Sequence, residues 1–554
     1  MSGQVKRPSL RTRLAELLER QAPGQGGDCR HDWFWRRAKD FVARGLLDES
    51  SRIWRDDPHQ IDKAIGKVEQ AWSLTRDPKI AVQLATMYDR ANRNQDALVV
   101  LREAFRADPR HALVRHHAAI TLLRHGDTPD IRDFFDSVLT VDPSDAFAQF
   151  VKSLLDNYDV WVEELISSID RKRDGRQPFV ISCPVWGQAF ADNFVSFVCA
   201  ALLSPNNLPE LAKRCSVHLV IFTSAETESY LSADPLFARL NEYAAVRFIR
   251  YDERQINHGK YMEACYGHEE VFYSPRSLAF YYARNCKFAL MSCAHYVALA
   301  AGRATDAFVS CQVADTFLND GALMLMADRL ESDADAVLVN CIQLDGKVLR
   351  PILDGAFRRE DGALEISSAN WSKILVKHMP EYNFLDANGL PQIQLRICWR
   401  VGADGILVHG NHYHPIGLRP KAFAHPLELT IDPIDSRFID RSSLSLDRIH
   451  LVQDASIVGI SIEEGPLAEQ LEHGGGSLQI ADVAFWLWGY WGRLRGALFR
   501  SPLRFGGVTS GEEWGRVEAS ASVVVDAIVD RAAQLEERQR AKRSWRLQRR
   551  SQRG

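Results

Sequence analysis

The chain has 554 residues, more than the roughly 250 to 300 at which a single hydrophobic core stops growing, so we expect two domains and a tail. Hydrophobic residues make up 46% and charged residues 25%, as in ordinary globular proteins, which excludes a chain that is disordered throughout. The net charge of -4 argues against a specific nucleic-acid partner or an anionic membrane as the principal partner.

The N-terminal segment 1–21 is polar and charged, and it lacks the apolar run and small-residue cleavage site of a secretory signal. The ten cysteines form no CxxC pair, which suits a reducing compartment. The most apolar short run, 483–491, is much shorter than the about 20 residues of a membrane-spanning helix. We therefore expect a cytoplasmic protein with no transmembrane segment, for which peripheral membrane contact stays open, and a helical or partly ordered arm over 1–57.

Residues 58–170 have a repeating helical pattern. Asp-Pro pairs recur along it, and the tract 78–109 places small residues, Ala85, Ala97 and Ala104, where two paired helices would approach closely. Pro109 would end the second helix, because proline cannot donate to the helical ladder. This pattern resembles the tetratricopeptide (TPR) repeat, and 112–143 is a degenerate copy with Ile131 at a position where a small residue is usual. An ordinary helical bundle is the alternative.

A different pattern begins after the charged junction 170–176. Apolar runs at 178–183, 217–222, 245–250, 307–313 and 336–341 read as strands separated by helices. Strands alternating with helices predict a Rossmann-like, mostly parallel α/β sheet over 177–430, with its ligand site at the carboxyl ends of the strands. We expect 431–530 to form helices that pack on this domain, and 531–554 to be a basic tail that is helical or disordered.

Small and polar residues follow the predicted strands. They are Pro184, Trp186, Gly187, Thr223, Asp252, Asp315 and Asp320. The layout resembles the GT-A fold of glycosyltransferases over about residues 178 to 430, and most of all bacterial proteins that carry a divergent GT-A-like domain beside helical repeats. The resemblance implies a nucleotide-sugar donor, with Pro184, Trp186 and Gly187 under the base, and Thr223 and Asp252 also in the nucleotide site. Core packing of Trp186 and helix capping by Asp252 are the alternatives.

The resemblance also implies a divalent cation, Mn²⁺ or Mg²⁺, which would neutralise charge on the donor diphosphate. GT-A enzymes carry a DxD motif, whereas this chain has Ala314-Asp315-Thr316, so Asp315 is the candidate metal ligand. Asp320 and Asp404 are candidates by position for a catalytic carboxylate on the acceptor side. The alternative for Asp320 is a simple turn, because Asn319-Asp320-Gly321 has the residue types that turns require.

Three histidines, His409, His412 and His414, follow an apolar run and resemble the segment from which GT-A enzymes often take a metal-binding imidazole. If this segment is extended, His412 and His414 share one face and His409 takes the other. A solvated loop, or rings bonded to backbone, is the alternative. By contrast, we interpret His295, inside a long predicted helix, as a core residue with satisfied ring nitrogens.

The function that we predict is transfer of a sugar from a nucleotide-sugar to a glycan or protein acceptor, with the repeats recruiting the acceptor or a protein partner. One alternative is a non-catalytic scaffold with a degenerate glycosyltransferase-like domain, which the missing DxD favours. The other is a metal-dependent hydrolase built on the histidine segment, which would need further ligands.

Overall fold

The computed structural model describes residues 29–551 except 57–59, 92, 127, 170–174, 267–277, 386–395, 411–412, 464–478, 490–494, 507–510 and scattered positions between 426 and 443. The chain divides near residue 150 into two compact units. The first unit is residues 1–149, and the second is residues 150–270 with 274–554.

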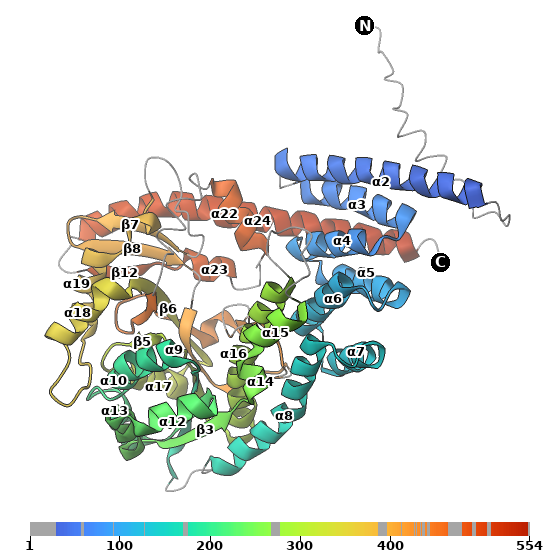
Figure 1. The fold of residues 1–554 in the computed structure, drawn as a ribbon. Helices are drawn as coiled ribbons and strands as arrows, with labels where there is room; N and C mark the ends of the chain where they lie inside the picture. Colours follow the sequence, from blue (N-terminus) through green and yellow to red (C-terminus); the bar gives the residue numbers. More distant parts are fainter. Residues whose placement is uncertain are drawn as a thin grey trace. The chain divides into compact units, whose positions relative to one another are not determined.

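The first unit consists of helices that follow one another as antiparallel hairpins (Figure 1). Their bounds are α2 (Cys29–Asp56), α3 (Ile61–Thr75), α4 (Pro78–Arg90), α5 (Asn94–Ala107), α6 (Ala112–His125) and α7 (Thr128–Val141). This arrangement confirms the predicted N-terminal helical-repeat region. A further helix, α8 (Ala146–Ser168), begins in this unit and continues in the second from Phe150 onward.

The sequence of the repeats explains how their helices end and pack. Asp77 caps α4 by accepting a hydrogen bond from the Lys79 backbone N–H at 2.9 Å, and α5 ends at Ala107, just before Pro109. Ala97 and Ala104 of α5 are completely buried, as expected of small residues that let neighbouring helices approach closely. The degenerate position Ile131 is also buried, so the larger side chain is accommodated in α7.

In the described part of the second unit, nine strands form one mixed sheet. The order is β3-β2-β1-β4-β9-β6-β11-β5, with β10 beside β6. The bounds are β1 (Gln177–Pro184), β2 (Cys215–Thr223), β3 (Ala245–Arg250), β4 (Phe308–Cys311), β5 (Thr316–Leu318), β6 (Ala336–Asp345), β9 (Tyr413–Leu418), β10 (Ile449–Leu451) and β11 (Gly459–Glu463). The five strands predicted from apolar runs are confirmed as β1, β2, β3, β4 and β6.

The expectation of a mostly parallel sheet is confirmed for β1, β2, β3, β4, β6, β10 and β11, which run in the same direction, but the sheet is not parallel throughout. Strand β9 runs antiparallel between β4 and β6, and β11 runs antiparallel to β5. Strands β10 and β11 also lie beyond residue 430, where we expected only packing helices. Ile460 and Ile462 of β11 are buried in the same core as β1 and β6, and β11 connects β6 to the edge strand β5.

Helices cover the two faces of the sheet around β1. Phe179, Ile181 and Cys183 pack toward the helical run that follows β1, made of α9 (Gln188–Asn193), η3 (Phe194–Cys199) and α10 (Ala200–Leu202). Ser182 points to the other face, where its hydroxyl donates to the Ala294 carbonyl of α16 (Leu278–Thr305) at 3.1 Å. Alternation along β1 therefore places α9 and α16 on opposite faces.

A second, three-stranded sheet has the order β12-β8-β7, with β7 (Arg396–Val401), β8 (Gly405–Gly410) and β12 (Leu503–Gly506). Helix α22 (Ile480–Gly489) packs beside the long helix α24 (Gly511–Ser551), and the Trp488 indole N–H donates to Glu536 at 3.3 Å. Val483, Ala484, Leu487 and Trp488 are buried, so the described part of the apolar run that begins at Val483 contributes packed side chains. The backbone of the basic tail is helical as far as Ser551.

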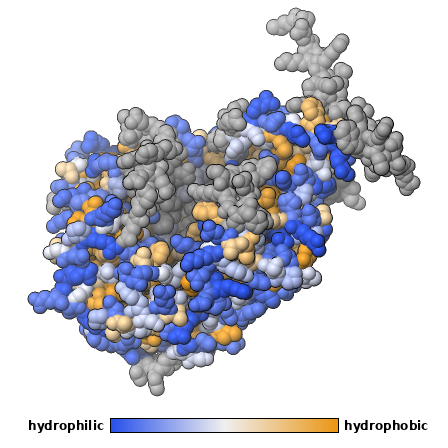
Figure 2. All heavy atoms as spheres, viewed as in Figure 1, coloured by the Kyte–Doolittle hydropathy of each residue, from blue (hydrophilic) through white to orange (hydrophobic). Residues whose placement is uncertain are grey.

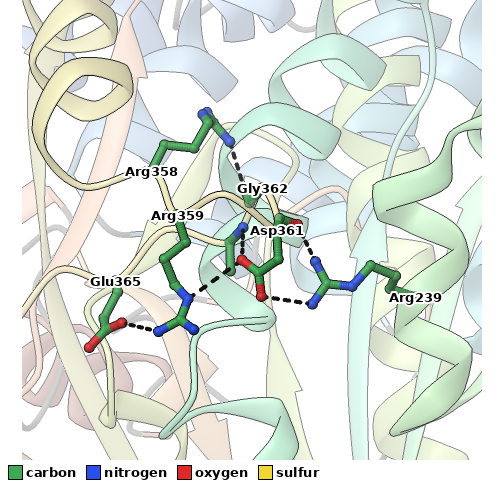
Figure 3. A network of polar contacts seen from close by, with 7 residues as sticks. Arg239, Arg358, Arg359, Asp361, Gly362 and Glu365 are labelled. Carbon is green, nitrogen blue, oxygen red and sulfur yellow. Dashed lines mark hydrogen bonds and ion pairs between the residues drawn. The ribbon is translucent and has the colours of Figure 1, made fainter.

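A polar network holds the loop after α18 (Gly346–Ala356) against η4 (Arg239–Glu242), as Figure 3 shows. Arg239 donates to the carboxylate and to the backbone carbonyl of Asp361. Arg358 donates to the Gly362 carbonyl at 3.0 Å, and Arg359 pairs with both Asp361 and Glu365. These bonds fix the path of the loop from both sides.

No helix within the described residues is long and apolar enough to cross a bilayer. On the face drawn in Figure 2, hydrophobic residues lie in small patches among hydrophilic ones.

Candidate functional site

The strand order places a topological switch point between β1 and β4. From β1 the chain continues to β2 and β3 on one side, whereas β4 lies on the other side of β1. Segments that leave the carboxyl ends of such strands diverge and form a crevice, which is where open α/β sheets bind ligands. Here the two segments are 185–187 and 312–315, and the Gln312 amide donates to the Ser182 carbonyl at 2.9 Å.

The β1 side of the switch point has an open backbone turn. Gly187 is exposed and has φ of 83°, in the left-handed region that favours glycine, and its amide donates to the Thr227 hydroxyl at 3.2 Å. Trp186 is half-buried, and its ring meets Tyr251 edge-on with centroids 6.2 Å apart. Pro184 is buried as the last residue of β1, opposite Phe222. A ligand therefore has access to Gly187 and part of Trp186, but not directly to Pro184.

Two other candidates follow β2 and β3. Thr223 is completely buried, and its hydroxyl has no hydrogen-bond partner among the described residues. Asp252 is exposed and forms a capping box with Gln255 at the start of α14 (Glu253–Ile256). The capping alternative therefore explains Asp252 fully, because its carboxylate accepts from the Gln255 amide at 2.7 Å.

A lysine and a phenylalanine, neither of which we singled out in the sequence, meet at the switch point. Phe190 comes from α9 and Lys287 from α16, and the Lys287 ammonium lies 5.3 Å from the centroid of the Phe190 ring. Since the two helices cover opposite faces, this contact lies beyond the end of β1. In the sequence, the presence of Lys287 within the apolar pattern of a long helix could have marked it as a candidate site residue.

Asp315 is the acidic residue at the end of the β4 segment. Burial raises the pKa of its carboxyl above the ordinary value, opposed by its own amide, by the charge of Lys287 and by the Thr316 hydroxyl. The Asp315 carbonyl accepts from the Ile462 amide at 2.9 Å, which ties its backbone to β11. The half-buried carboxylate thus has a fixed backbone and a cationic neighbour.

Neither candidate catalytic carboxylate lies free at this edge. Asp320 accepts hydrogen bonds from the Asn206 amide at 2.9 Å and from its side chain at 2.6 Å, so it joins two loops. Asp404 is exposed in the turn between β7 and β8, in the smaller sheet. These contacts favour the turn alternative for Asp320, and they place Asp404 in a different sheet from β4.

Two of the three histidines of the segment 406–415 lie within the described residues, and they do not come together. His409 is buried in β8, where Nδ1 lies 3.0 Å from the Phe499 carbonyl and Trp399 packs edge-on against the ring. His412 lies outside the described residues. His414 belongs to β9 in the large sheet, at the end nearest the 312–315 segment, because β9 runs antiparallel to β4. The structure thus places His409 and His414 in different sheets.

His414 meets a second histidine from α16. The rings of His295 and His414 lie with centroids 6.0 Å apart, and burial lowers the pKa of His414 to about 4. His414 Nε2 and both ring nitrogens of His295 are buried without a hydrogen-bond partner among the described residues. The prediction that His295 is buried is confirmed, but its ring nitrogens are not satisfied as expected. The sequence indicates that His295 lies on the apolar side of a helix, but it does not show which residue its ring contacts.

The described residues contain no group of three or more His, Cys, Asp or Glu side chains that could hold a metal ion. Mg²⁺, however, is usually held by one or two carboxylates, water and the phosphates of a substrate. Asp315 fits that smaller requirement.

Comparisons with known proteins provide no family for this chain. No family model and no curated protein matches it. Among solved structures, it is similar to a mutant of the O-GlcNAc transferase of Thermobaculum terrenum at 14% sequence identity and a TM-score of 0.17. The match covers 41% of this chain and 44% of that chain, so it spans less than half of the solved protein.

Proposed function

We propose that the second unit is a glycosyltransferase of GT-A type, which binds a nucleotide-sugar at the switch point between β1 and β4 and transfers its sugar to a glycan or protein acceptor. One observation carries this proposal. The open turn at Gly187, the cation of Lys287 and the carboxylate of Asp315 follow or flank the two strands whose carboxyl ends diverge.

Each of these groups suits one part of such a donor. The turn at Gly187 lets the ligand approach the backbone, and the rings of Trp186 and Phe190 provide apolar surface for a base. Lys287 supplies positive charge for a diphosphate. A divalent cation held by Asp315, and by His414 if its ring turns toward the same ion, would stabilise the charge that develops on the leaving diphosphate.

The proposal assigns no catalytic base to Asp320 or Asp404. Asp320 is bonded to Asn206, and Asp404 lies in the exposed turn of the smaller sheet. For the first unit we propose recruitment of the acceptor or of a protein partner, because stacked helical repeats commonly present binding surfaces.

A second candidate function is a scaffold whose α/β unit no longer transfers sugar. The observation that favours it is the single carboxylate, Asp315, where a DxD motif would supply two. An assay of nucleotide release from a panel of nucleotide-sugars, with Mn²⁺ and in EDTA, separates the two functions. Release that needs Mn²⁺ and is lost in Asp315→Asn supports the transferase. No release or donor binding with any member of the panel would contradict it.

A further inference from the structure

Arg396 is a buried cation with unused hydrogen-bonding capacity. It opens β7 and is only 2% exposed. Its Nη2 donates to the Gln343 side-chain oxygen at 3.1 Å, while Nη1 is buried and has no hydrogen-bond partner in the part of the chain that the structure describes. Among the described residues, no carboxylate lies within ion-pair distance of it. Four residues later in the strand, Arg400 is exposed and pairs with Glu381, as an arginine ordinarily does.

This state of Arg396 is unfavourable for the unliganded protein. A buried charge without a counter-ion loses its hydration and gains little in exchange. The guanidinium presents several N–H donors in a planar fork, and that geometry matches the oxygens of a phosphate or carboxylate. An anionic ligand would therefore satisfy both the unpaired charge and the unused Nη1.

The surroundings of Arg396 lead to the candidate site. Thr316 of β5 pairs with Ser461 of β11, which in turn pairs with Gln343 of β6. Directly paired residues point to the same face of a sheet, so these three polar side chains form a row. The row ends at Gln343, which accepts the hydrogen bond from Arg396. Asp315 immediately precedes Thr316, and their side-chain oxygens lie 3.4 Å apart.

Cys341 links the two charged residues independently. Burial raises the pKa of its thiol to about 12, while the charge of Arg396 lowers this pKa and the charge of Asp315 raises it. Both charges therefore act on one buried sulfur. Arg396 of the smaller sheet and Asp315 beside the large sheet therefore approach the same thiol, one as a cation and one as a carboxylate.

We propose that Arg396 binds an oxyanion of the diphosphate of the ligand, separately from the cation at Asp315. The inference rests on the proposed function for the identity of the ligand, but not on sugar transfer itself. Because Nη1 is closed to solvent, an anion reaches it only when the arginine changes rotamer or neighbouring side chains part.

The test is binding of inorganic pyrophosphate to the full-length protein in EDTA, measured by titration calorimetry. We expect the wild-type protein to bind, Arg396→Met to lose at least about tenfold in affinity, and the matched control Arg400→Met to bind like wild type. Equal affinity of wild type and Arg396→Met, or no binding by wild type, overturns the proposal. Neither result bears on nucleotide release with Mn²⁺, so failure here is distinct from failure of the proposed function.

A stability measurement separates binding from a structural role. Without ligand, Arg396→Met should melt at the same temperature as wild type or higher, because an unpaired buried charge is removed. A fall of more than roughly 5 °C, or failure to fold, would show that the fold needs the arginine and would overturn the proposal. Arg396→Lys provides a second variant, expected to fold and to bind pyrophosphate more weakly than wild type. If Arg396→Lys binds pyrophosphate as tightly as wild type, the planar guanidinium group is not needed to bind the anion.

Discussion

The ammonium of Lys287 lies 5.3 Å from the centroid of the Phe190 ring, although the two residues come from helices on opposite faces of the sheet. Phe190 is 38% exposed, more than is usual for a phenylalanine in a well-packed unit. An exposed ring beside a cation can contact a base and a phosphate of the same nucleotide. The pair also lies beside the segments that follow β1 and β4, where a ligand is expected from topology alone.

Lys287→Met should weaken nucleotide binding without destabilising the protein. Its charge acts on Asp315 and would act on a diphosphate, whereas its exposed side chain contributes little to packing. We expect a loss of about tenfold in affinity for uridine or guanosine diphosphate, whichever the protein binds, equivalent to about 1.4 kcal/mol. Calorimetry checks this, with exposed Lys373→Met of α19 (Ser368–His378) as the control. Equal losses in both variants would mean that Lys287 acts only through net charge.

Asp315→Asn should remove the Mn²⁺ dependence of nucleotide release without lowering stability, whereas Asp320→Ala should lower stability without changing that dependence. Burial raises the pKa of Asp315, so its ionised form is disfavoured in the folded protein, and the neutral amide should leave the free energy of unfolding unchanged or higher. The same variant should remove Mn²⁺-dependent nucleotide release. Asp320→Ala removes two hydrogen bonds from Asn206 and should cost about 1 to 3 kcal/mol while the response to Mn²⁺ stays.

Urea unfolding and nucleotide-release assays at several Mn²⁺ concentrations measure both effects. A stable Asp315→Asn variant that keeps its Mn²⁺ dependence would remove Asp315 from the proposed cation site. Loss of that dependence in Asp320→Ala would restore Asp320 as a candidate.

The sequence predicted those parts of the fold that depend on local patterns. The alanines of α5 and the apolar runs of β1 and β2 mark packing surfaces directly, since their spacing follows the geometry of one helix or strand. It could not predict that β9 lies antiparallel between β4 and β6, because a short buried strand has the same apolar composition in either direction. For the same reason β11, with its buried isoleucines, was not distinguished from packing helices.

At the candidate site, residues next to strand ends were predictable and residues that arrive from distant segments were not. Asp315 and Gly187 follow their strands in sequence. Lys287 and Arg396 reach the region from α16 and from the smaller sheet, and the sequence around each of them does not show which distant residues its side chain meets. The histidines illustrate the same limit, since the close spacing of His409 and His414 hid their division between two sheets.

The first unit should lose stability as the pH falls from about 6.5 to about 4. Burial, followed by the charge of Arg124, lowers the pKa of His117 to about 4, and burial lowers that of His116 well below the ordinary value near 6.5. In this window the unfolded chain binds protons that the folded chain does not, so the free energy of unfolding falls, by less than about 1.4 kcal/mol per pH unit for each histidine. Above about pH 6.5 both histidines are neutral in the folded and in the unfolded chain, so the free energy of unfolding is not reduced by their protonation.

Urea midpoints at pH 7.5 and 5.0 measure this dependence. His117→Gln should reduce the difference between the two midpoints, because one of the two perturbed imidazoles is gone. A difference as large as that of wild type would assign the pH dependence to other groups.

Gly362→Ala should destabilise the second unit by about 1 to 2 kcal/mol, since Gly362 has φ of 84° and a side chain at this dihedral is strained. An added Cβ would also lie 3.0 Å from a methyl carbon of Leu236. The loop cannot relax freely, because Arg239 holds Asp361 and Arg358 holds the Gly362 carbonyl (Figure 3). Gly355→Ala in α18 is the matched control: an added Cβ there meets nothing within 4 Å, and alanine favours a helix, so its unfolding free energy should stay equal or rise. Urea unfolding of both variants tests the difference, and equal stability would mean that the loop relaxes despite its arginine contacts.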